Sequence, residues 1–189
     1  MSESCGGHEV VDNFELMLVR AKRGDTEAAG RLFCSSRKRL WRIAYMVLQD
    51  EEDAKDATQD AFVKAFGSLR SLRASDQKGW EAWLVTITCN CAKDRYAARA
   101  PLALPRVDPP EWFDDGRLLP DAQTVLSLRL QALLRRLPFG KRSAVVLVDM
   151  YGWTRKEAAR MLGVPQGTID SWICDARKKL RQALESEHD

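Results

Sequence analysis

The side chains with the clearest chemical potential lie near the C-terminus, between residues 166 and 178. They combine amide, hydroxyl, carboxylate and basic groups, which contact base edges and phosphates in DNA. A carboxylate is repelled by phosphate but can accept a hydrogen bond from the amino group of cytosine. The side chains expected to contact DNA are Gln166, Gly167, Thr168, Asp170, Ser171, Trp172, Asp175, Arg177 and Lys178.

Two short predicted helices must position these side chains. Thr154 and Glu157 stand three residues apart, the spacing of a capping box that opens a helix. This helix should end at Gly163, because Pro165 disfavours helical backbone at the residue before it. A second helix then begins near Gln166, with apolar residues at helical spacing.

The corner between these helices has the pattern of a helix-turn-helix. Ala159 is small enough for close helix contact, Gly163 suits the corner, and Ile169 can lock the second helix on the first. Basic residues at positions 177–181 follow at the end expected to contact phosphate. The alternative is an ordinary helical hairpin in a bundle, but the agreement of cap, corner and apolar positions favours DNA binding.

No group of residues predicts catalysis or metal binding. Five cysteines, an odd number without framework spacing, indicate reduced thiols. Cys89 and Cys91 would stand about 200° apart around a helix, so they cannot easily share a metal ion. Cys5 with His8 is a weak metal or redox signal, and both His8 and His188 fall in predicted tails. We therefore expect no enzyme activity, no cofactor and no small-molecule substrate.

Composition is that of a water-soluble, folded protein. Of the 189 residues, 45% are hydrophobic and 30% are charged, and the net charge is only +3. A nucleic-acid surface must therefore come from local clustering of charge. The sequence lacks an apolar run of about 18 residues and a signal-peptide pattern, so we expect a cytoplasmic protein without membrane insertion.

Helical periodicity without any strand pattern predicts an all-α fold of two small domains. Five prolines between residues 101 and 120 predict a linker. The predicted organisation is a flexible tail at 1–11, a first domain at 12–99, a linker at 100–123 and a helix-turn-helix domain at 124–185. Helices are expected at about 13–22, 25–48, 49–66, 80–99, 126–137 and 143–151, with a loop at 67–79.

The acidic helix at 49–66 has two contrasting faces. One face carries alanines and Phe62, which favours close packing against other helices. The opposite face carries Asp53, Asp56, Gln59 and Asp60. By itself this face could be merely solvated.

Four segments, in order, resemble the extracytoplasmic-function sigma factors of bacterial RNA polymerase. RGDTEAAGRL resembles the opening helices of that family, and DAKDATQDAFVKAF its polymerase-binding helix. WEAWLVTITCNCAKDR resembles the helix that melts and reads the −10 element. The segment from LRRLPFGKRSAVVLVDMYGWTRKEAARM to LGVPQGTIDSWICDARKKL resembles the domain that reads the −35 element.

This resemblance implies roles for particular residues. Core polymerase would contact Asp53, Asp56, Gln59 and Asp60. Asn90 would line the pocket for a flipped-out base of the −10 element, since an amide can both donate to and accept from a base edge. Trp80 and Trp83 fit the domain core better than base stacking. The full set expected at the −10 element is Leu72, Arg73, Asn90, Lys93, Asp94 and Arg95.

Two departures from the family concern DNA reading. Leu72 and Arg73 stand in a slightly long loop where an aromatic and a basic residue are common. The recognition helix carries Asp170, Trp172 and Asp175 where family members usually have arginine or other basic or polar residues.

The resemblance further implies three partners: core RNA polymerase, promoter DNA and an inhibitory anti-sigma factor. It also implies that the free chain is a monomer. The alternative is a stand-alone helix-turn-helix repressor or activator that binds DNA as a dimer. It would leave the acidic helix and the linker without a role.

Overall fold

The computed structural model describes residues 14–99 and 125–185, and every regular element in these two ranges is helical. The predicted tail at 1–11 and linker at 100–123, with Cys5, His8 and His188, lie outside the described residues. The first range contains α1 (Phe14–Lys22), α2 (Thr26–Leu48), α3 (Glu51–Ser68), the 3-10 helix η1 (Leu69–Ser71) and α4 (Gln77–Arg99). The second contains α5 (Val125–Arg135), α6 (Phe139–Val145), the π-helix η3 (Val146–Met150), α7 (Arg155–Leu162) and α8 (Gln166–Glu185).

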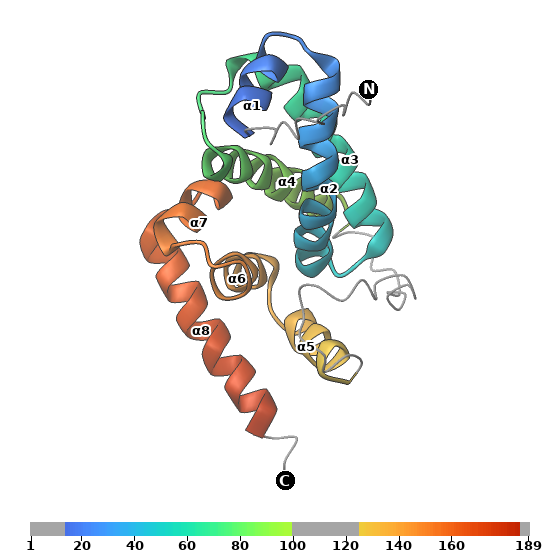
Figure 1. Cartoon of the computed structure of the whole chain (residues 1–189). Helices are drawn as coiled ribbons and strands as arrows, with labels where there is room; N and C mark the ends of the chain where they lie inside the picture. Colours follow the sequence, from blue (N-terminus) through green and yellow to red (C-terminus); the bar gives the residue numbers. More distant parts are fainter. Residues whose placement is uncertain (1–13, 100–124, 186–189) are drawn as a thin grey trace, which may run out of the picture.

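Helices α2, α3 and α4 pack against one another, and α1 lies against α2 (Figure 1). The alanine face of α3 is completely buried, since Ala54, Ala57, Ala61 and Ala65 have no exposed surface. Small side chains let helix axes approach closely. The two faces predicted for this helix are therefore present.

Aromatic side chains fill the rest of the first core. Trp80 is 1% exposed, and its indole N–H donates to the Ser36 hydroxyl at 3.1 Å. Its ring centroid lies 5.2 Å from Phe33 and 5.4 Å from Trp83, which is partly buried. Both tryptophans thus lie in the core, as predicted.

The predicted loop at 67–79 is shorter than expected. Helix α3 continues to Ser68, η1 follows, and α4 already begins at Gln77. The early start of α4 has a local cause, because the Asp76 carboxylate accepts a hydrogen bond from the Gly79 N–H at 3.0 Å. Only residues 72–76 remain irregular between η1 and α4.

The helix predicted at 143–151 begins earlier, at Phe139, and changes its hydrogen bonding after Val145. Pro138 precedes its first residue, where a missing N–H costs no helical hydrogen bond. From Val146 the turns widen into η3, and the chain then enters the helix-turn-helix.

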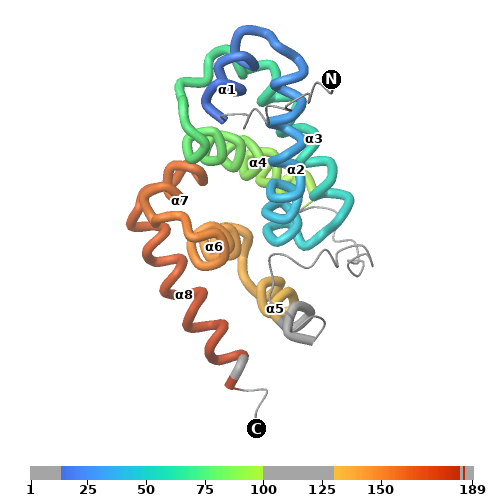
Figure 2. The backbone as a smooth tube through the Cα atoms, in the orientation of Figure 1, coloured from blue at the N-terminus to red at the C-terminus, as the bar shows by residue number. Residues whose placement is uncertain are grey.

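The two described ranges contact each other, with α6 against α2 and α7 against α4 (Figures 1 and 2). Tyr96 of α4 stacks on Phe139 of α6, with ring centroids 4.6 Å apart. The Arg39 guanidinium of α2 lies 5.7 Å from the centre of the Tyr151 ring and 6.0 Å from that of Trp153. The two ranges are therefore held together by cation–π attraction as well as by contact between aromatic side chains.

Among the described helices, none combines the length and apolar character needed to cross a membrane.

Candidate functional site

The predicted helix-turn-helix is formed by α7 and α8. The Thr154 hydroxyl accepts from the Glu157 N–H at 3.2 Å, and the Glu157 carboxylate accepts from the Thr154 N–H at 2.9 Å. Gly163 ends α7 in the left-handed region, at φ 65°, where a side chain would be strained. Ile169 is fully buried at the helix junction. The capping box and corner predicted from the sequence are both present.

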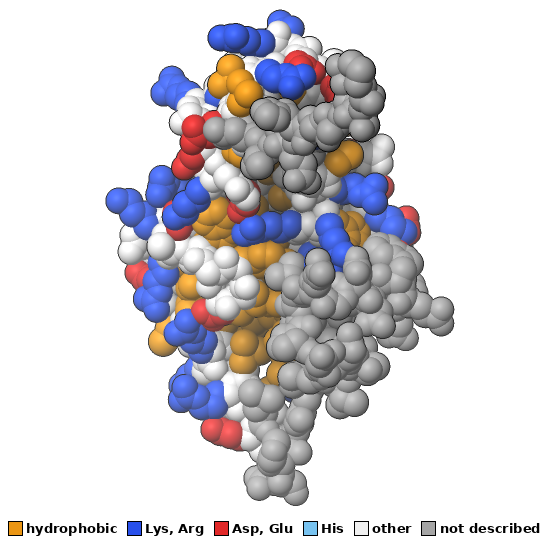
Figure 3. All heavy atoms as spheres, viewed as in Figure 1, with side chains coloured by type: hydrophobic (Ala, Val, Ile, Leu, Met, Phe, Trp, Pro, Cys, Tyr) orange, Lys and Arg blue, Asp and Glu red, His pale blue; other side chains and the backbone are white. Residues whose placement is uncertain are grey.

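The burial pattern of α8 leaves one face open. Ile169, Ile173 and Ala176 are buried, and the outer side of α7 and α8 carries many of the basic side chains visible in Figure 3. Thr168 and Asp170 are half-buried. The predicted DNA contacts that lie exposed on α8 are Gln166, Gly167, Ser171, Asp175, Arg177 and Lys178.

Asp170 and Asp175 of α8 are each paired with a basic side chain. Arg155 lies 3.0 Å from Asp170, and Lys141 lies 2.8 Å from Asp175. A hydrogen bond from Lys141 holds the pKa of Asp175 below its usual value. The negative charge expected to repel phosphate is therefore largely compensated by residues of α6 and α7.

Arg177 is also engaged within the protein. Its guanidinium donates to the Asp149 carboxylate of η3, at 2.5 Å for the closer nitrogen, and this hydrogen bond raises the pKa of Arg177. Lys178 is exposed on the next position. These two residues, grouped together from the sequence, thus have different environments.

Trp172 packs against α6. A Cβ atom at Gly140 would lie 2.6 Å from Cη2 of its indole, so the ring covers the glycine directly. Trp172 is half-buried and belongs to the edge of the core. Its partner could not be recognised from the sequence, because Gly140 lies on a different helix.

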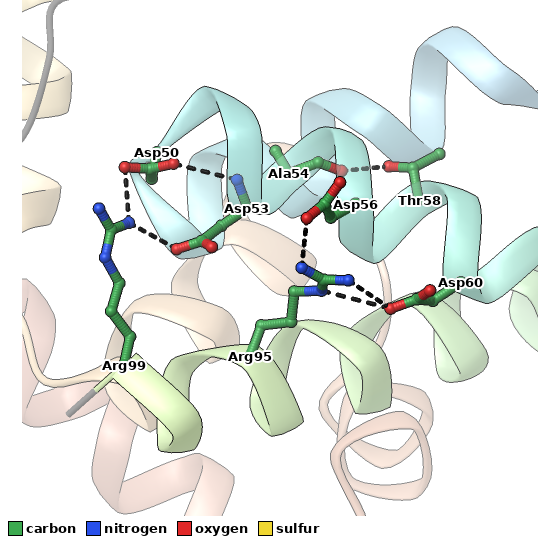
Figure 4. A network of polar contacts seen from close by, with 8 residues as sticks. All are labelled: Asp50, Asp53, Ala54, Asp56, Thr58, Asp60, Arg95 and Arg99. Atoms are coloured by element: carbon green, nitrogen blue, oxygen red, sulfur yellow. Dashed lines mark hydrogen bonds and ion pairs between the residues drawn. The ribbon is translucent and has the colours of Figure 1, made fainter. Parts of the chain in front are cut away.

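The carboxylates of α3 face the end of α4, where two arginines bind them (Figure 4). Arg95 donates to Asp60 at 2.8 Å and also to Asp56. Arg99 lies 2.5 Å from both Asp50 and Asp53. Three residues predicted to bind polymerase are therefore engaged by α4, together with one that sequence reasoning missed, Asp50.

Asp50 has a structural role as well. Its side chain caps α3 by accepting from the Asp53 N–H at 3.0 Å. Burial acts to raise the pKa of Asp50, but this N–H and Arg99 together hold it below its usual value. An aspartate directly before an acidic helical turn is the sequence signal that identifies such a cap.

Beyond these ion pairs, α3 presents an exposed stripe. Gln59, Val63 and Phe66 follow one another at helical spacing, and the two apolar side chains are 70% and 55% exposed. Val63 and Phe66 were not singled out from the sequence. Their position outside the alanine face was the available signal.

The residues predicted to read the −10 element do not form one cluster. Asn90, Lys93 and Asp94 share an exposed face of α4, and Asp94 lies 3.6 Å from Lys64 of α3. Arg73 is exposed, whereas Leu72 is half-buried and packs against the core. Arg95 points toward α3 instead (Figure 4).

Among the cysteines of α4 and α8, only Cys174 is exposed on one of these surfaces. Cys89 and Cys91 are buried, and burial raises the pKa of Cys89 to about 12. Cys174 is exposed on α8. Within residues 14–99 and 125–185, no three metal-binding side chains come together.

Comparison with known protein families matches both parts of the chain. Residues 32–101 match the family described as Sigma-70 region 2, and residues 127–180 match Sigma-70, region 4. The first match covers α3 and α4, and the second covers the helix-turn-helix.

Individual relatives agree with this assignment. The chain is 34% identical to the ECF RNA polymerase sigma factor SigM of Mycobacterium tuberculosis H37Rv, over 95% of this chain and 88% of SigM. It is 35% identical to SigE of Mycolicibacterium smegmatis, over 77% of this chain and 57% of SigE.

Solved structures show the same fold. CnrH in complex with the cytosolic domain of CnrY is 27% identical, with a TM-score of 0.64 over 91% of this chain and 97% of CnrH. The sigma factor RpoE in complex with the anti-sigma factor NepR from Bartonella quintana has the same TM-score at 23% identity, over 82% of this chain and 96% of RpoE.

Regions 2 and 4, in this order in one chain, define a sigma-70-type transcription initiation factor. The chain belongs to the ECF RNA polymerase sigma factors. Membership favours the sigma factor over the stand-alone regulator considered from the sequence.

Proposed function

We propose that α3 binds core RNA polymerase, that α4 captures the −10 element and that α8 reads the −35 element. The observation that carries the proposal is the solvent-exposed face at the N-terminal end of α8. This helix follows the capped α7 in the geometry of a helix-turn-helix. No step of this function requires a catalytic residue, a metal or a cofactor.

The polymerase surface would centre on Gln59. This side chain is exposed on α3, between the carboxylates Asp56 and Asp60 and the apolar pair Val63 and Phe66. An amide, partly exposed carboxylates and apolar groups together suit a protein partner with basic and apolar side chains. Asp53 is more enclosed by its ion pair, so we assign it to the edge of this surface.

The −10 surface would centre on Asn90. Its amide is exposed near the middle of α4, with Lys93 and Asp94 on the same face. Lys93 can contact phosphate while Asn90 pairs with a base edge. Leu72 would support the loop from the core side, and Arg73 would contact the strand from the loop.

The −35 surface would divide its work among three kinds of residue. Gln166, Ser171 and Asp170 would face base edges, while Lys178 and Arg177 would contact phosphate. Trp172 would hold α8 against α6 rather than touch DNA. Gly167 and Thr168 would allow close approach of the helix start, and Asp175 would orient Lys141.

Promoter binding requires the two ranges to separate. The −10 and −35 elements lie about 25 base pairs apart, which is about 85 Å at about 3.4 Å per base pair. In the structure α4 and α7 touch through Lys78 and Glu157, 2.8 Å apart. Residues 100–124 could span a comparable distance, since each extended residue adds about 3.3–3.6 Å.

An anti-sigma factor would bind the free chain. The relative CnrH was solved in complex with the cytosolic domain of CnrY, and the fold of this chain matches CnrH over most of its length. Exposed Leu16, Val19, Val63 and Phe66 offer apolar area for such a protein partner. We further propose that the free chain is a cytoplasmic monomer.

Run-off transcription with purified core polymerase tests the proposed function. Addition of the chain should start transcripts at a fixed position on genomic fragments, and core polymerase alone should not. The proposal is overturned if the chain binds palindromic DNA as a dimer and directs no initiation.

A further inference from the structure

Arg95 connects two surfaces that have different ligands in the proposed function. It lies on α4, the helix assigned to promoter DNA, yet its guanidinium is held by α3, the helix assigned to polymerase (Figure 4). Nη2 and Nε donate to Asp60 at 2.8 and 3.3 Å, and Nη1 donates to Asp56. Three of the five N–H donors of the guanidinium are thus committed to carboxylates of α3, so release from these ion pairs is what makes the whole group available to phosphate.

The ion pairs of Arg95 are open to exchange. About half of each carboxylate side chain is exposed, 50% for Asp56 and 48% for Asp60, and Arg95 itself is 31% exposed. Pairs in contact with water are weak and easily replaced by other charged partners. A basic side chain of another protein could therefore reach these carboxylates.

Arg99 provides an internal contrast. Its partner Asp50 is only 11% exposed and also caps α3, and its other partner Asp53 is 22% exposed. This pair is part of the helix start and has little access to a partner. Of these two arginines, Arg95 thus makes the more exchangeable contacts.

We propose that Asp56 and Asp60 hold Arg95 as internal substitutes for phosphate, so that polymerase binding to these carboxylates releases Arg95 to promoter DNA. The inference rests on the proposed function of α3 and α4. Coupling between two binding surfaces is reciprocal, so DNA bound through Arg95 also favours polymerase binding at the carboxylates. The raised pKa of Arg95, caused first by the hydrogen bond that it donates to Asp60, agrees with a firmly charged, shared group.

The test measures DNA binding by the full chain without polymerase. The probe is a fluorescein-labelled single strand of about 20 nucleotides and mixed sequence, because a phosphate contact is independent of sequence. Asp56→Asn with Asp60→Asn should release Arg95 and raise the affinity several-fold. The dependence of log affinity on log salt concentration should steepen by about 0.7 for the additional phosphate contact.

Glu51→Gln with Glu52→Gln is the matched control. It removes the same two negative charges from α3, but these carboxylates bind Lys55 of their own helix. The inference is supported if DNA affinity rises less in this control than in the Asp56→Asn, Asp60→Asn chain. It also requires that Arg95→Gln lower DNA affinity more in the Asp56→Asn, Asp60→Asn background than in the native chain. Equal gains in both double variants would show a general charge effect and overturn it, as would the absence of any gain in a folded Asp56→Asn, Asp60→Asn chain.

A second measurement covers the case in which the double variant does not fold. Arg95→Gln should reduce the salt dependence of DNA binding more strongly in the polymerase-bound chain than in the free chain, and an equal reduction in both would overturn the inference. Run-off transcription by the native chain separates the two levels. If the native chain directs transcription but polymerase binding does not change the DNA contact of Arg95, only the inference about Arg95 is rejected. If the native chain directs no transcription, the proposed function itself is rejected.

Discussion

Lys78 and Glu157 form an ion pair, 2.8 Å long, between the start of α4 and the first helix of the helix-turn-helix. Glu157 belongs to the capping box of α7, so one carboxylate serves both the local helix start and the contact between the two ranges. The arrangement packs α4 against the first helix of the helix-turn-helix, although the promoter elements proposed for these two parts lie far apart.

Removal of Lys78 should loosen the closed arrangement. The Lys78 side chain is 67% exposed, so Lys78→Ala should lower the free energy that holds the two ranges together by at most about 1 kcal/mol. Dyes attached to exposed Cys34 and Cys174, in a Cys5→Ser background, report the distance between α2 and α8. Energy transfer should fall slightly in the variant and strongly when core polymerase is added. Lys55→Ala, which removes ion pairs confined to α3, should leave it unchanged, and no fall with polymerase would contradict the required separation.

The stabilising effect of Glu157 should depend on pH. Hydrogen bonds from Lys78 and from Thr154 lower the pKa of Glu157 from 4.5 to about 2. A lowered pKa means that the stabilisation is complete above pH 4.5 and is lost as the pH falls toward about 2. The difference in free energy of unfolding between the native chain and Glu157→Gln should therefore shrink over this range. A difference that stays constant from pH 6 to pH 2.5 would contradict the assigned contacts.

The capping box should be measurable separately through Thr154. Thr154→Ala removes the acceptor for the Glu157 N–H and should destabilise the chain by about 1 kcal/mol, as loss of an N-cap usually does. Urea denaturation followed by circular dichroism gives this value. Thr154→Ser keeps the hydroxyl and should recover most of the loss.

Gly140 should not tolerate a side chain. The Cβ of Gly140→Ala would lie 2.6 Å from the Trp172 indole, and overpacking of this kind costs about 1–3 kcal/mol. Gly30→Ala in α2 is the control, because its Cβ would have no neighbour within 4 Å. This substitution should stabilise the helix by up to about 1 kcal/mol. If both variants were stabilised, the packing of Trp172 against α6 would be wrong.

Gln59 and Val63 should contribute to polymerase affinity without contributing to stability. Both are exposed on α3, so Gln59→Ala and Val63→Ser should change the free energy of unfolding by less than about 0.5 kcal/mol. Each should weaken binding to core polymerase in a fluorescence titration. Glu52→Ala changes an exposed residue of the first turn and should bind normally. Unchanged affinity in the two test variants would place the polymerase surface elsewhere.

Asp170 and Lys178 should affect −35 binding differently. If Asp170 accepts from cytosine, Asp170→Ala should lower discrimination at one base pair by about 1–3 kcal/mol. Lys178→Ala should weaken binding to all sequences and reduce the salt slope by about one unit. A uniform increase in affinity after Asp170→Ala would mean that Asp170 acts by restraining Arg155, 3.0 Å away, rather than by reading a base.

The sequence by itself determined the helices and the corner of the helix-turn-helix. Thr154 and Glu157 interact across three residues, and Gly163 acts on its own backbone conformation, so these signals are complete within one turn of helix. The alanine periodicity of α3 likewise needs only one helix, and the order of motifs was sufficient to indicate the family. Boundaries that depend on flanking contacts, such as the starts of α4 and α6, were displaced by several residues.

Only the tertiary structure decided which charged groups are available to ligands. Arg95 was predicted at DNA and Asp56 at polymerase, but the packing of α3 against α4 brings them together across 39 residues of sequence. Trp172 was predicted to contact DNA, and the position of Gly140 places its ring against α6. Local rules specify which side chains share a helix face, whereas the partner of a long side chain depends on the helix that packs opposite that face.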